Sequence, residues 1–333
     1  MAVSFTILGA GSWGTVMAAH LHDAGYPVTL WHYREEFTRS LAQSHRHPHL
    51  EGFILPDDIV ISADINEAIS RGEILVVATP SQEVRRVMEL TANLISNHRV
   101  ANLSKGIERG TLKRMSEVIA EAGGVPGDRI ASIYGPSHAE EVMRKVPTAL
   151  VAASTNLAYA RELQGIFSTH YMRVYANSDI IGVELGGSIK NVIAIAAGIC
   201  VGLGFGDNTM AALVTRGLTE ITRLGVAMGA DIHTFAGLSG VGDLAVTVYS
   251  RHSRNRRLGV EIGRGWKFEK VIDDMGMVAE GVYTAQSVMD LAGKLQVEMP
   301  ICREVFQVLF KDKNPRQAIA DLMTRDLRDE TLP

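Results

Sequence analysis

The chain has 333 residues, of which 46% are hydrophobic and 21% are charged, and its 33 basic and 37 acidic residues give a net charge of −4. This length suggests about two domains, and the composition is that of a globular protein and excludes a disordered chain. A nucleic-acid-binding protein is also disfavoured, because binding to phosphate backbones needs a clear basic surplus.

The first half of the chain alternates between strand-like and helix-like segments. Short apolar runs rich in β-branched residues predict eight strands, which are Val3–Leu8, Val28–Trp31, Ile59–Ser62, Ile74–Ala78, Arg99–Asn102, Ile130–Tyr134, Ala149–Ala152 and Met172–Tyr175. Helix-like stretches lie between most of them, such as Thr15–Asp23, Glu83–Leu94, Leu112–Glu121 and Leu157–Phe167. This alternation predicts an α/β fold of Rossmann type, a doubly wound and mostly parallel sheet covered on both faces.

The second half of the chain loses the strand signal after about Tyr175. Helical periodicity takes over in the segments Ile180–Val201, Thr209–Met228, Asn255–Ile262, Thr284–Leu295 and Arg303–Phe310. We therefore expect an α/β domain over residues 1–180 and an all-α domain over residues 181–333, joined by a long helix that leaves the sheet.

A glycine-rich motif, Gly9-Ala10-Gly11-Ser12-Trp13-Gly14, directly follows the first predicted strand and opens the first helix. In such a GxGxxG context the first glycine permits a tight turn, the second lets backbone amides approach a pyrophosphate, and the third allows close packing of helix on strand. The helix N-terminus adds unpaired N–H groups and a partial positive charge. The motif predicts that residues 1–180 bind a dinucleotide; the alternative is a plain strand-to-helix turn.

The end of the second predicted strand bears on the choice between NAD and NADP. An NAD site usually has Asp or Glu in this zone for the ribose 2′-hydroxyl, whereas this chain reads His32-Tyr33-Arg34-Glu35. The Arg34 guanidinium suits a 2′-phosphate, which predicts that NADP is accepted and leaves the preference between NADP and NAD open. In the alternative, Arg34 is a solvated residue at a helix start and Glu35 binds the ribose.

Polar residues follow three of the predicted strands, at the sheet edge where ligands of open α/β sheets bind. The segments are Thr79-Pro80-Ser81, Asn102-Leu103-Ser104-Lys105-Gly106 and Tyr134-Gly135-Pro136-Ser137-His138-Ala139-Glu140-Glu141. Ser137 suits the cap of a helix, and this role is compatible with a ligand contact because a helix start also attracts anions.

Lys190 lies among apolar residues in the long helix predicted after the sheet. Burial there would depress the pKa of its ammonium group and allow proton exchange near neutral pH; the alternative is a lysine that extends to solvent. Two later segments favour the first alternative, in which Lys190 belongs to a functional site. Asp243 follows a glycine-rich turn, and Ser253-Arg254-Asn255 at a helix start offers a phosphate a hydroxyl, a guanidinium and an amide. A nucleic-acid patch is disfavoured there because interleaved aromatic residues are missing.

Seven motifs, in order along nearly the whole chain, resemble those of the bacterial NAD(P)-dependent glycerol-3-phosphate dehydrogenases. They are GAGSWGT (Gly9–Thr15), LSKGIE (Leu103–Glu108), YGPSHAEEV (Tyr134–Val142), GGSIKNVIAIAAGI (Gly186–Ile199), GLSGVGDL (Gly237–Leu244), SRNRRLG (Ser253–Gly259) and VAEGVYTA (Val278–Ala285). The resemblance implies reversible reduction of dihydroxyacetone phosphate to sn-glycerol 3-phosphate by NADH or NADPH, a reaction that supplies phospholipid synthesis.

The resemblance also implies roles for individual residues. The cofactor-binding set is Gly9, Gly11, Ser12, Trp13, Gly14, Tyr33, Arg34, Lys105, Ala139, Arg254, Val278 and Glu280. The substrate-binding set is Lys105, Gly135, Ser137, Lys190, Asp243, Ser253, Arg254 and Asn255. Lys190 is implied to be the catalytic proton donor and acceptor, with Lys105 and Asp243 as the other catalytic residues. Whether Asp243 orients Lys190 or binds a substrate hydroxyl stays open, and this chemistry requires no metal.

Two other functions fit a two-domain dinucleotide-binding chain. A β-hydroxyacid or hydroxyacyl-CoA dehydrogenase would have the glycine loop but no need for Ser253-Arg254-Asn255. A catalytically silent NAD(P)H-binding regulator would need neither the lysines nor the aspartate. His45, His47 and His49 alternate in one segment and could bind a metal, but we expect a solvated or substrate-edge loop.

The remaining expectations concern the cellular setting. Cys200 and Cys302 lie outside any CxxC or Cys/His cluster, which predicts buried thiols in a reducing compartment rather than a disulfide or a zinc site. No signal peptide is recognisable before the first strand. The longest apolar run, Val192–Phe205, is shorter than the roughly 20 residues that span a bilayer. We expect a cytoplasmic protein without a membrane span, and a homodimer is among the assemblies that the sequence allows.

Overall fold

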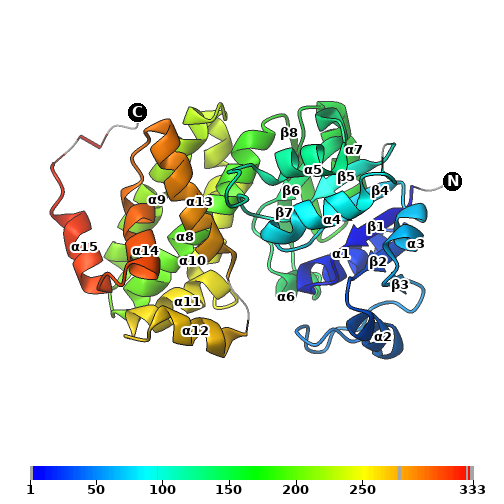
Figure 1. Ribbon diagram of the computed structural model, residues 1–333, viewed down its shortest axis with the longest axis horizontal. Helices are drawn as coiled ribbons and strands as arrows, with labels where there is room; N and C mark the ends of the chain where they lie inside the picture. Colours follow the sequence, from blue (N-terminus) through cyan, green and yellow to red (C-terminus); the bar gives the residue numbers. More distant parts are fainter. Residues whose placement is uncertain (1–2, 96, 277–278, 328, 331–333) are drawn as a thin grey trace. The chain divides into compact units, whose positions relative to one another are not determined.

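The computed structural model describes residues 3–95, 97–276, 279–327 and 329–330. The chain divides into two compact units, the sheet-containing unit 1 (residues 1–105 and 115–180) and the helical unit 2 (residues 106–114 and 181–333). Figure 1 shows the sheet of unit 1 and the helices of unit 2. Residues 106–114, which the sequence pattern leaves inside the first half, belong with the helical unit.

Unit 1 contains one eight-stranded sheet with the strand order β3-β2-β1-β4-β5-β6-β7-β8. Its strands are β1 (Phe5–Leu8), β2 (Val28–Trp31), β3 (Val60–Ser62), β4 (Ile74–Val77), β5 (Arg99–Asn102), β6 (Ile130–Tyr134), β7 (Thr148–Ala153) and β8 (Met172–Asn177). Neighbouring strands are parallel, except that β6 and β7 are antiparallel. The predicted doubly wound, mostly parallel sheet is confirmed.

Helices cover both faces of this sheet. They are α1 (Ser12–Asp23), α2 (Glu35–Ser44), α3 (Ile65–Ser70), α4 (Val84–Thr91), α5 (Met115–Gly123), α6 (Ala139–Val142) and α7 (Leu157–Phe167), with the 3-10 turns η1 (Ser81–Glu83) and η2 (Gly127–Arg129). Alternate residues of a strand point to opposite faces. Ile74 and Val76 of β4 therefore join a core formed with α1, α6 and α7, while Leu75 and Val77 join one formed with α3, α4 and α5.

Over the described residues that follow α7 and β8, unit 2 consists of helices and their connecting turns, while its segment 106–114 forms an isolated β-bridge between Ile107 and Arg114. Its helices are α8 (Ile180–Gly202), α9 (Asp207–Ala227), α10 (Asp243–Tyr249), α11 (Arg254–Gly263), α12 (Phe268–Met275), α13 (Glu280–Leu295), α14 (Pro300–Phe310) and α15 (Pro315–Met323), with the 3-10 turn η3 (Ile232–Ala236) and the π-helical turn η4 (Leu238–Gly242). The five predicted helical segments are confirmed as α8, α9, α11, α13 and α14. The shorter α10, α12 and α15 were not predicted, because each spans too few turns to show a clear period.

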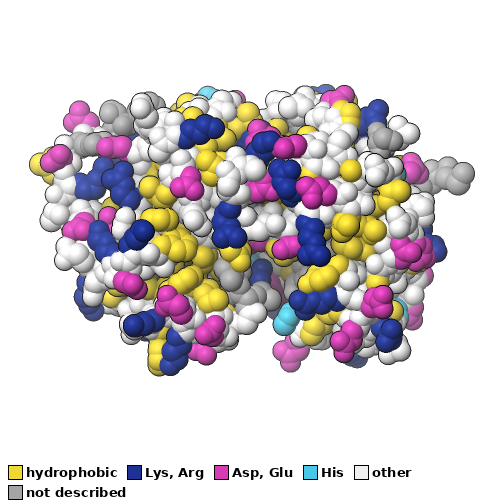
Figure 2. All heavy atoms as spheres, in the orientation of Figure 1, with side chains coloured by type: hydrophobic (Ala, Val, Ile, Leu, Met, Phe, Trp, Pro, Cys, Tyr) yellow, Lys and Arg dark blue, Asp and Glu magenta, His cyan; other side chains and the backbone are white. Residues whose placement is uncertain are grey.

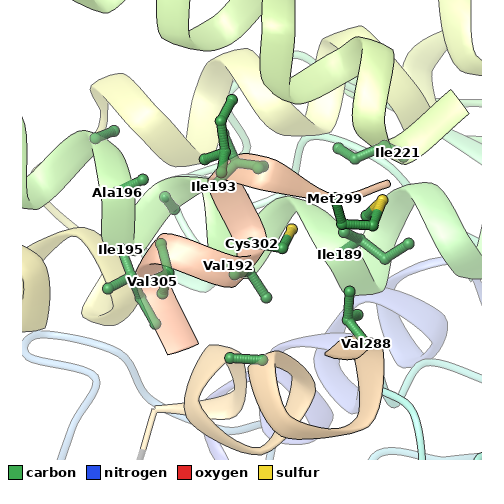
Figure 3. Close-up of a cluster of buried hydrophobic side chains, with 14 of the residues drawn as sticks. Ile189, Val192, Ile193, Ile195, Ala196, Ile221, Val288, Met299, Cys302 and Val305 are labelled. Atoms are coloured by element: carbon green, nitrogen blue, oxygen red, sulfur yellow. The ribbon is translucent and has the colours of Figure 1, made fainter. Parts of the chain in front are cut away.

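Helix α8 is the core helix of unit 2. Figure 3 shows its residues Ile189 and Val192 among side chains of α9, α13 and α14, including Ile221, Val288 and Cys302. By length and composition α8 could cross a membrane, but 89% of its most apolar stretch is buried inside the protein. A helix that is apolar on all sides is expected at the centre of a helical core. Both cysteines are buried free thiols, as predicted.

Glycines bring α8 and α11 into backbone contact. A Cβ atom on Gly198 would lie 2.1 Å from the Arg256 carbonyl oxygen, and one on Gly259 would lie 2.1 Å from the Ile195 carbonyl oxygen. No larger residue fits at either position without moving a helix. The start of α11 is therefore held firmly against the helix that carries Lys190.

The surface of the protein mixes charges of both signs. Figure 2 shows acidic and basic side chains interspersed over one face, in keeping with the net charge of −4. Exposed ion pairs such as Arg71–Glu67 and Arg264–Glu261 join residues of one helical segment. Pairs of this kind typically contribute only about 0–1 kcal/mol, so the apolar cores dominate the stability of the fold.

Candidate active site

The loop between β1 and α1 is shaped for close approach of its backbone to a ligand. Gly9 has a φ angle of +119°, and a Cβ atom there would lie 2.7 Å from the Ala78 carbonyl oxygen. A Cβ atom on Gly14 would lie 2.0 Å from the Gly9 oxygen, so only glycine lets α1 begin this close to β1. At Gly11, by contrast, a Cβ atom would meet nothing within 4 Å. This open side of the loop leaves room for a pyrophosphate.

The first turn of α1 has the properties of an anion site. Gly11 is the N-cap residue and has no side chain to bond the amides of that turn. Ser12 and Trp13, the first helical residues, are half-buried. Uncapped amides and the positive end of the helix dipole favour a phosphate. The residues present therefore fit a dinucleotide, with Gly9, Gly11, Ser12, Trp13 and Gly14 around its pyrophosphate.

Tyr33 and Arg34 follow β2, the neighbour of β1 in the sheet, and both are exposed. Arg34 Nε donates a hydrogen bond to the Tyr33 hydroxyl at 2.7 Å, and the guanidinium carbon lies 5.2 Å from the Tyr33 ring centroid. Glu35 lies in the first turn of α2, where a carboxylate stabilises the helix dipole. An exposed guanidinium that is held in place by the Tyr33 ring and hydroxyl suits the 2′-phosphate of NADP.

Lys105 follows β5 and reaches over the end of β6. Its Nζ donates to the Gly135 carbonyl oxygen at 3.1 Å and lies 5.4 Å from the centroid of the Tyr134 ring. Gly135 has a φ angle of +142°, a conformation that L side chains rarely adopt, so its carbonyl direction depends on glycine. The strand ends of unit 1 thus bring Lys105 and Gly135 together.

A buried polar network positions the segment that carries Lys105. Asn102 Nδ2 donates to Ser132 Oγ at 3.0 Å and to the Tyr134 hydroxyl at 2.9 Å. Asn102 Oδ1 accepts from the Ser104 amide at 2.9 Å, and the Tyr134 hydroxyl donates to the Ser104 carbonyl. The sequence placed Asn102 and Tyr134 at the ligand edge of the sheet but assigned neither of them an individual role. The available signal was a polar residue at the end of each of two otherwise apolar strands.

Ser137 and Ala139 lie beside Gly135 at the start of α6. The Ser137 hydroxyl donates to the Gly135 carbonyl oxygen at 3.1 Å. The prediction that Ser137 caps the helix is wrong, because His138 still has an extended backbone and is itself the N-cap. Ala139 is the first residue of α6 and is buried.

Lys190 lies in the middle of α8 in unit 2 and is only 5% exposed. Its ammonium group forms a buried ion pair with Asp243 and donates to Thr247 Oγ1 at 2.7 Å. The alternative in which Lys190 extends to solvent is wrong, because these partners hold it inside. Lys190 is thus buried as one half of an ion pair and not as an isolated charge among apolar residues.

Thr247 completes this cluster and was missed in the sequence. It lies one turn after Asp243 on α10, and its hydroxyl donates to the Asp243 carbonyl oxygen at 2.6 Å. With its hydrogen so directed, the Thr247 oxygen presents a lone pair to the Lys190 ammonium. The spacing of four residues on a helix was the signal that could have found it.

The residues that follow Lys105 in the chain are anchored in unit 2. The Gly106 carbonyl oxygen accepts from Ser188 Oγ at 3.2 Å. Arg114 and Glu184 form a buried ion pair with a nitrogen–oxygen distance of 2.6 Å. Both Ser188 and Glu184 belong to α8, so this short segment is attached to the same helix as Lys190. Removing one member of a buried pair leaves an uncompensated charge, typically a loss of about 3–5 kcal/mol.

The basic motif of unit 2 begins α11, as predicted. Ser253 is the N-cap residue, and its hydroxyl accepts a hydrogen bond from the Arg256 amide at 3.2 Å. Arg254, at the first helical position, is exposed, whereas Asn255 is buried. Asn255 Oδ1 accepts from the Gly281 amide at 2.9 Å. The helix start therefore presents a guanidinium and uses Asn255 to fasten itself to α13.

Gly281 joins this helix start to the turn that carries Lys190. A Cβ atom on Gly281 would lie 2.7 Å from the Asn191 carbonyl oxygen and 2.7 Å from Asn255 Oδ1. Helices α8, α11 and α13 therefore meet one residue along the chain from Lys190. Glu280, the first residue of α13, is half-buried beside this point. Val278, also predicted to bind the cofactor, lies outside the described residues.

Comparison with known proteins covers nearly all of the chain. Residues 4–160 match the N-terminal model of NAD-dependent glycerol-3-phosphate dehydrogenase, and residues 179–320 match the C-terminal model. The glycerol-3-phosphate dehydrogenase (NAD(P)+) of Prosthecochloris aestuarii is 51% identical over 328 residues, 98% of this chain and 99% of the relative. That of Chlorobium phaeobacteroides is 50% identical over 331 residues, with the same coverage. The crystal structure of glycerol-3-phosphate dehydrogenase from Coxiella burnetii, 37% identical, matches with a TM-score of 0.92 over 97% of this chain and 99% of that one.

Proposed function

Because this chain belongs to the family of NAD-dependent glycerol-3-phosphate dehydrogenases, we propose that it reversibly reduces dihydroxyacetone phosphate to sn-glycerol 3-phosphate with NADH or NADPH. The observation that carries the proposal is the cluster of unit 2, a buried lysine paired with an aspartate next to a helix start that presents a guanidinium. A β-hydroxyacid or hydroxyacyl-CoA dehydrogenase is not favoured, because relatives from three bacteria at about half identity are named glycerol-3-phosphate dehydrogenase. The product is a precursor for phospholipid synthesis.

The cofactor is NAD or NADP, and when bound it supplies the hydride from its reduced nicotinamide ring. The open side of Gly11 and the amides at Ser12 and Trp13 receive the pyrophosphate in this proposal. Tyr33 and Arg34 bind the adenosine ribose, with the guanidinium available to a 2′-phosphate. Support comes from the geometry of the glycine loop and from the relatives, which are named for both cofactors.

Lys190 is the proposed proton donor in the reduction and proton acceptor in the oxidation. As hydride reaches the ketone carbon, negative charge develops on the ketone oxygen, and the ammonium transfers a proton to that oxygen. Asp243 and Thr247 hold Nζ in one place, so we assign Asp243 the role of orienting Lys190. A positioned general acid typically contributes 10²–10⁴-fold to the rate.

Two further groups bind and polarise the substrate in this proposal. Lys105 adds positive charge where the ketone oxygen becomes anionic. Arg254 binds the phosphate, together with the amides at the start of α11 that Ser253 and Asn255 organise. Binding energy from the phosphate, which does not react, is then available to position the carbonyl carbon.

The absorbance of reduced nicotinamide tests this function directly. Purified protein is mixed with dihydroxyacetone phosphate and with NADH or NADPH in parallel, and unphosphorylated dihydroxyacetone serves as the control substrate. We expect rapid oxidation only with the phosphorylated ketone. A protein that binds NADH or NADPH in a titration, yet oxidises neither with this substrate, would contradict the proposal.

The buried free thiols of Cys200 and Cys302 suit a reducing compartment, which supports a cytoplasmic location. Cell fractionation tests this location, with enzyme activity in a membrane or secreted fraction as the contrary result. Light scattering on the eluted protein tests the homodimer, for which a monomer mass is the contrary result.

A further inference from the structure

The alternating histidines of residues 45–49 are not used in the proposed reaction, yet one of them is buried. His47 is 5% exposed, whereas its neighbours Pro48 and His49 are exposed. Of the two expectations for this loop, solvated or at the substrate edge, the solvated one is wrong for His47. Leu50 and Leu55 anchor the loop in the core of unit 1 and carry His47 inside with them. Within the described part of the chain, no three His, Cys, Asp or Glu side chains are placed to hold a metal.

Both ring nitrogens of His47 have backbone partners. Nε2 lies 3.2 Å from the Ala10 carbonyl oxygen, and Nδ1 lies 3.2 Å from the His49 amide nitrogen. An amide N–H only donates and a carbonyl only accepts, so Nδ1 is the acceptor and Nε2 carries the hydrogen. The ring is therefore neutral and its tautomer is determined. In agreement, burial lowers the pKa of His47 to about 4.

The partner of Nε2–H, Ala10, lies between the first two glycines of the dinucleotide loop. The Ala10 carbonyl and the Gly11 amide belong to one peptide group, in which C=O and N–H point in opposite directions. A bond that holds the Ala10 oxygen therefore also fixes the direction of the Gly11 N–H. Gly11 leaves φ on the C-terminal side of this peptide freer than any other residue would, so a hydrogen bond to the Ala10 oxygen adds a restraint on its orientation.

Ring contacts also connect His47 to the segment of Tyr33 and Arg34, which are proposed to bind the adenosine ribose. The Phe37 ring centroid lies 5.7 Å from that of His47 and 4.5 Å from that of His32. His32 directly precedes Tyr33, and its Nδ1 accepts from the Arg34 amide at 3.2 Å. A row of three rings thus runs from the end of β2 to the glycine loop.

We propose that His47 is a positioning residue for the dinucleotide: its Nε2–H holds the Ala10–Gly11 peptide in the orientation that receives the pyrophosphate. The proposal rests on the dinucleotide site of the proposed function and is independent of the substrate and of Lys190. The pyrophosphate is common to both cofactors, so loss of this donor weakens NADH and NADPH equally.

Titration of NADH and of NADPH without substrate, followed by the fluorescence of the reduced nicotinamide, tests the proposal. His47→Leu removes the donor, whereas His47→Gln keeps an N–H at similar reach. His47→Leu is expected to raise both Kd values about tenfold, with kcat at saturating cofactor within about twofold. His47→Gln is expected to stay within about threefold of the unaltered protein. His49→Leu, on the same loop but exposed, is the matched control and leaves both Kd values unchanged.

Two results would overturn the proposal. One is a folded His47→Leu protein that binds both cofactors as tightly as the unaltered protein. The other is an equal loss for His47→Gln and His47→Leu, which would make ring packing responsible instead of the donor. If His47→Leu fails to fold, His47→Asn replaces it, because its amide is too short to reach Ala10. Failure of the proposed function is a separate result: dinucleotide titrations that behave as expected while dihydroxyacetone phosphate is not reduced.

Discussion

Two pairs of glycines, one in the loops of unit 1 and one in the helices of unit 2, serve different purposes. In unit 1, Gly9 and Gly135 have φ angles of +119° and +142° and shape loops that follow strands. In unit 2, Gly198 and Gly259 lie inside helices, where a Cβ atom would come within 2.1 Å of the facing backbone. The same residue type opens a loop to a ligand in one unit and closes the space between helices in the other.

The two lysines with proposed catalytic roles follow the same division. Lys105 lies in a loop and contacts a carbonyl oxygen and an aromatic ring, whereas Lys190 lies in a buried helix and is paired with Asp243. A loop is oriented by a few hydrogen bonds, while a buried helix is fixed by packing along its length. Changes in the glycine loop and at Arg34 of unit 1 should therefore alter cofactor affinity with the fold intact, and changes in the helices of unit 2 should alter rate, substrate affinity or stability.

The largest effect is expected at Lys190. Lys190→Ala should lower kcat by about 10³-fold or more, because the general acid is lost, and should leave the dinucleotide Kd unchanged. Steady-state rates and fluorescence titration measure the two quantities. Lys190→Met combined with Asp243→Asn is the control, since it leaves no unpaired buried charge. Turnover near the normal rate in either variant would contradict the assignment.

The next largest effect is expected in the pH dependence of stability, to which the two units contribute with opposite signs. Glu220 of α9 accepts from the Ile301 and Cys302 amides at 2.6 and 3.1 Å, and burial raises its pKa from 4.5 to about 7. A group whose pKa is higher in the folded than in the unfolded protein contributes its full stabilisation at pH values below the unfolded pKa. This stabilisation is lost as pH rises through the folded pKa. The free energy of unfolding should thus fall by up to about 3 kcal/mol between pH 4.5 and pH 7 from this group.

Urea unfolding of the unaltered protein and of Glu220→Gln across that pH range checks this prediction, and the variant should lack the decline. The contribution of His47 in unit 1 to stability changes with pH in the opposite direction. Its pKa is lowered from 6.5 to about 4, so its contribution to the free energy of unfolding is lost as pH falls from 6.5 to about 4. Identical pH slopes for the unaltered protein and the Glu220 variant would argue against the raised pKa.

Arg254 should control substrate affinity rather than the fold. Arg254→Ala should raise KM for dihydroxyacetone phosphate about 10–100-fold, because charge-assisted hydrogen bonds to a phosphate are lost. Arg257→Ala, also exposed and on the same helix, is the matched control. An unchanged KM for Arg254→Ala would mean that the phosphate is bound elsewhere.

A pair of glycine substitutions tests the comparison itself. Gly259→Ala should lower the free energy of unfolding by about 1–3 kcal/mol, because its methyl group overlaps the Ile195 carbonyl. Gly11→Ala meets open space and should leave stability nearly unchanged while weakening NADH binding. Thermal unfolding and cofactor titration of both variants give the result. A Gly11→Ala protein that is less stable than the Gly259→Ala protein would contradict this difference between loop glycines and helix glycines.

The smallest effect is expected at Arg34, next to the proposed position of the adenosine ribose. Arg34→Ala should raise the Kd for NADPH about tenfold and that for NADH less than about twofold, since only NADPH has the 2′-phosphate. Parallel fluorescence titrations measure both values. Equal changes for the two cofactors would remove the 2′-phosphate role of Arg34 and favour Glu35 as the ribose ligand.

Local patterns were enough to predict much of this protein. The apolar β-branched runs specified the strands, because a central parallel strand is buried on both faces. The glycine motif specified the turn before α1, since a positive φ angle and the closeness of Ala78, just after β4, leave little alternative at Gly9. Ser253 was predicted at a helix start for an equally local reason: its hydroxyl bonds an amide of the turn that it precedes.

Only the tertiary structure decided what these elements bring together. The Lys190–Asp243 contact joins residues 53 positions apart, and the Arg114–Glu184 pair joins residues 70 apart. Asn102 and Tyr134 became recognisable as supports of Lys105 once β5 and β6 were neighbours. His47 looked solvated in sequence and is buried, because apolar residues farther along its loop are anchored in the core. Sequence patterns report the conformation of a few consecutive residues, whereas burial and partners depend on which distant segments pack against them.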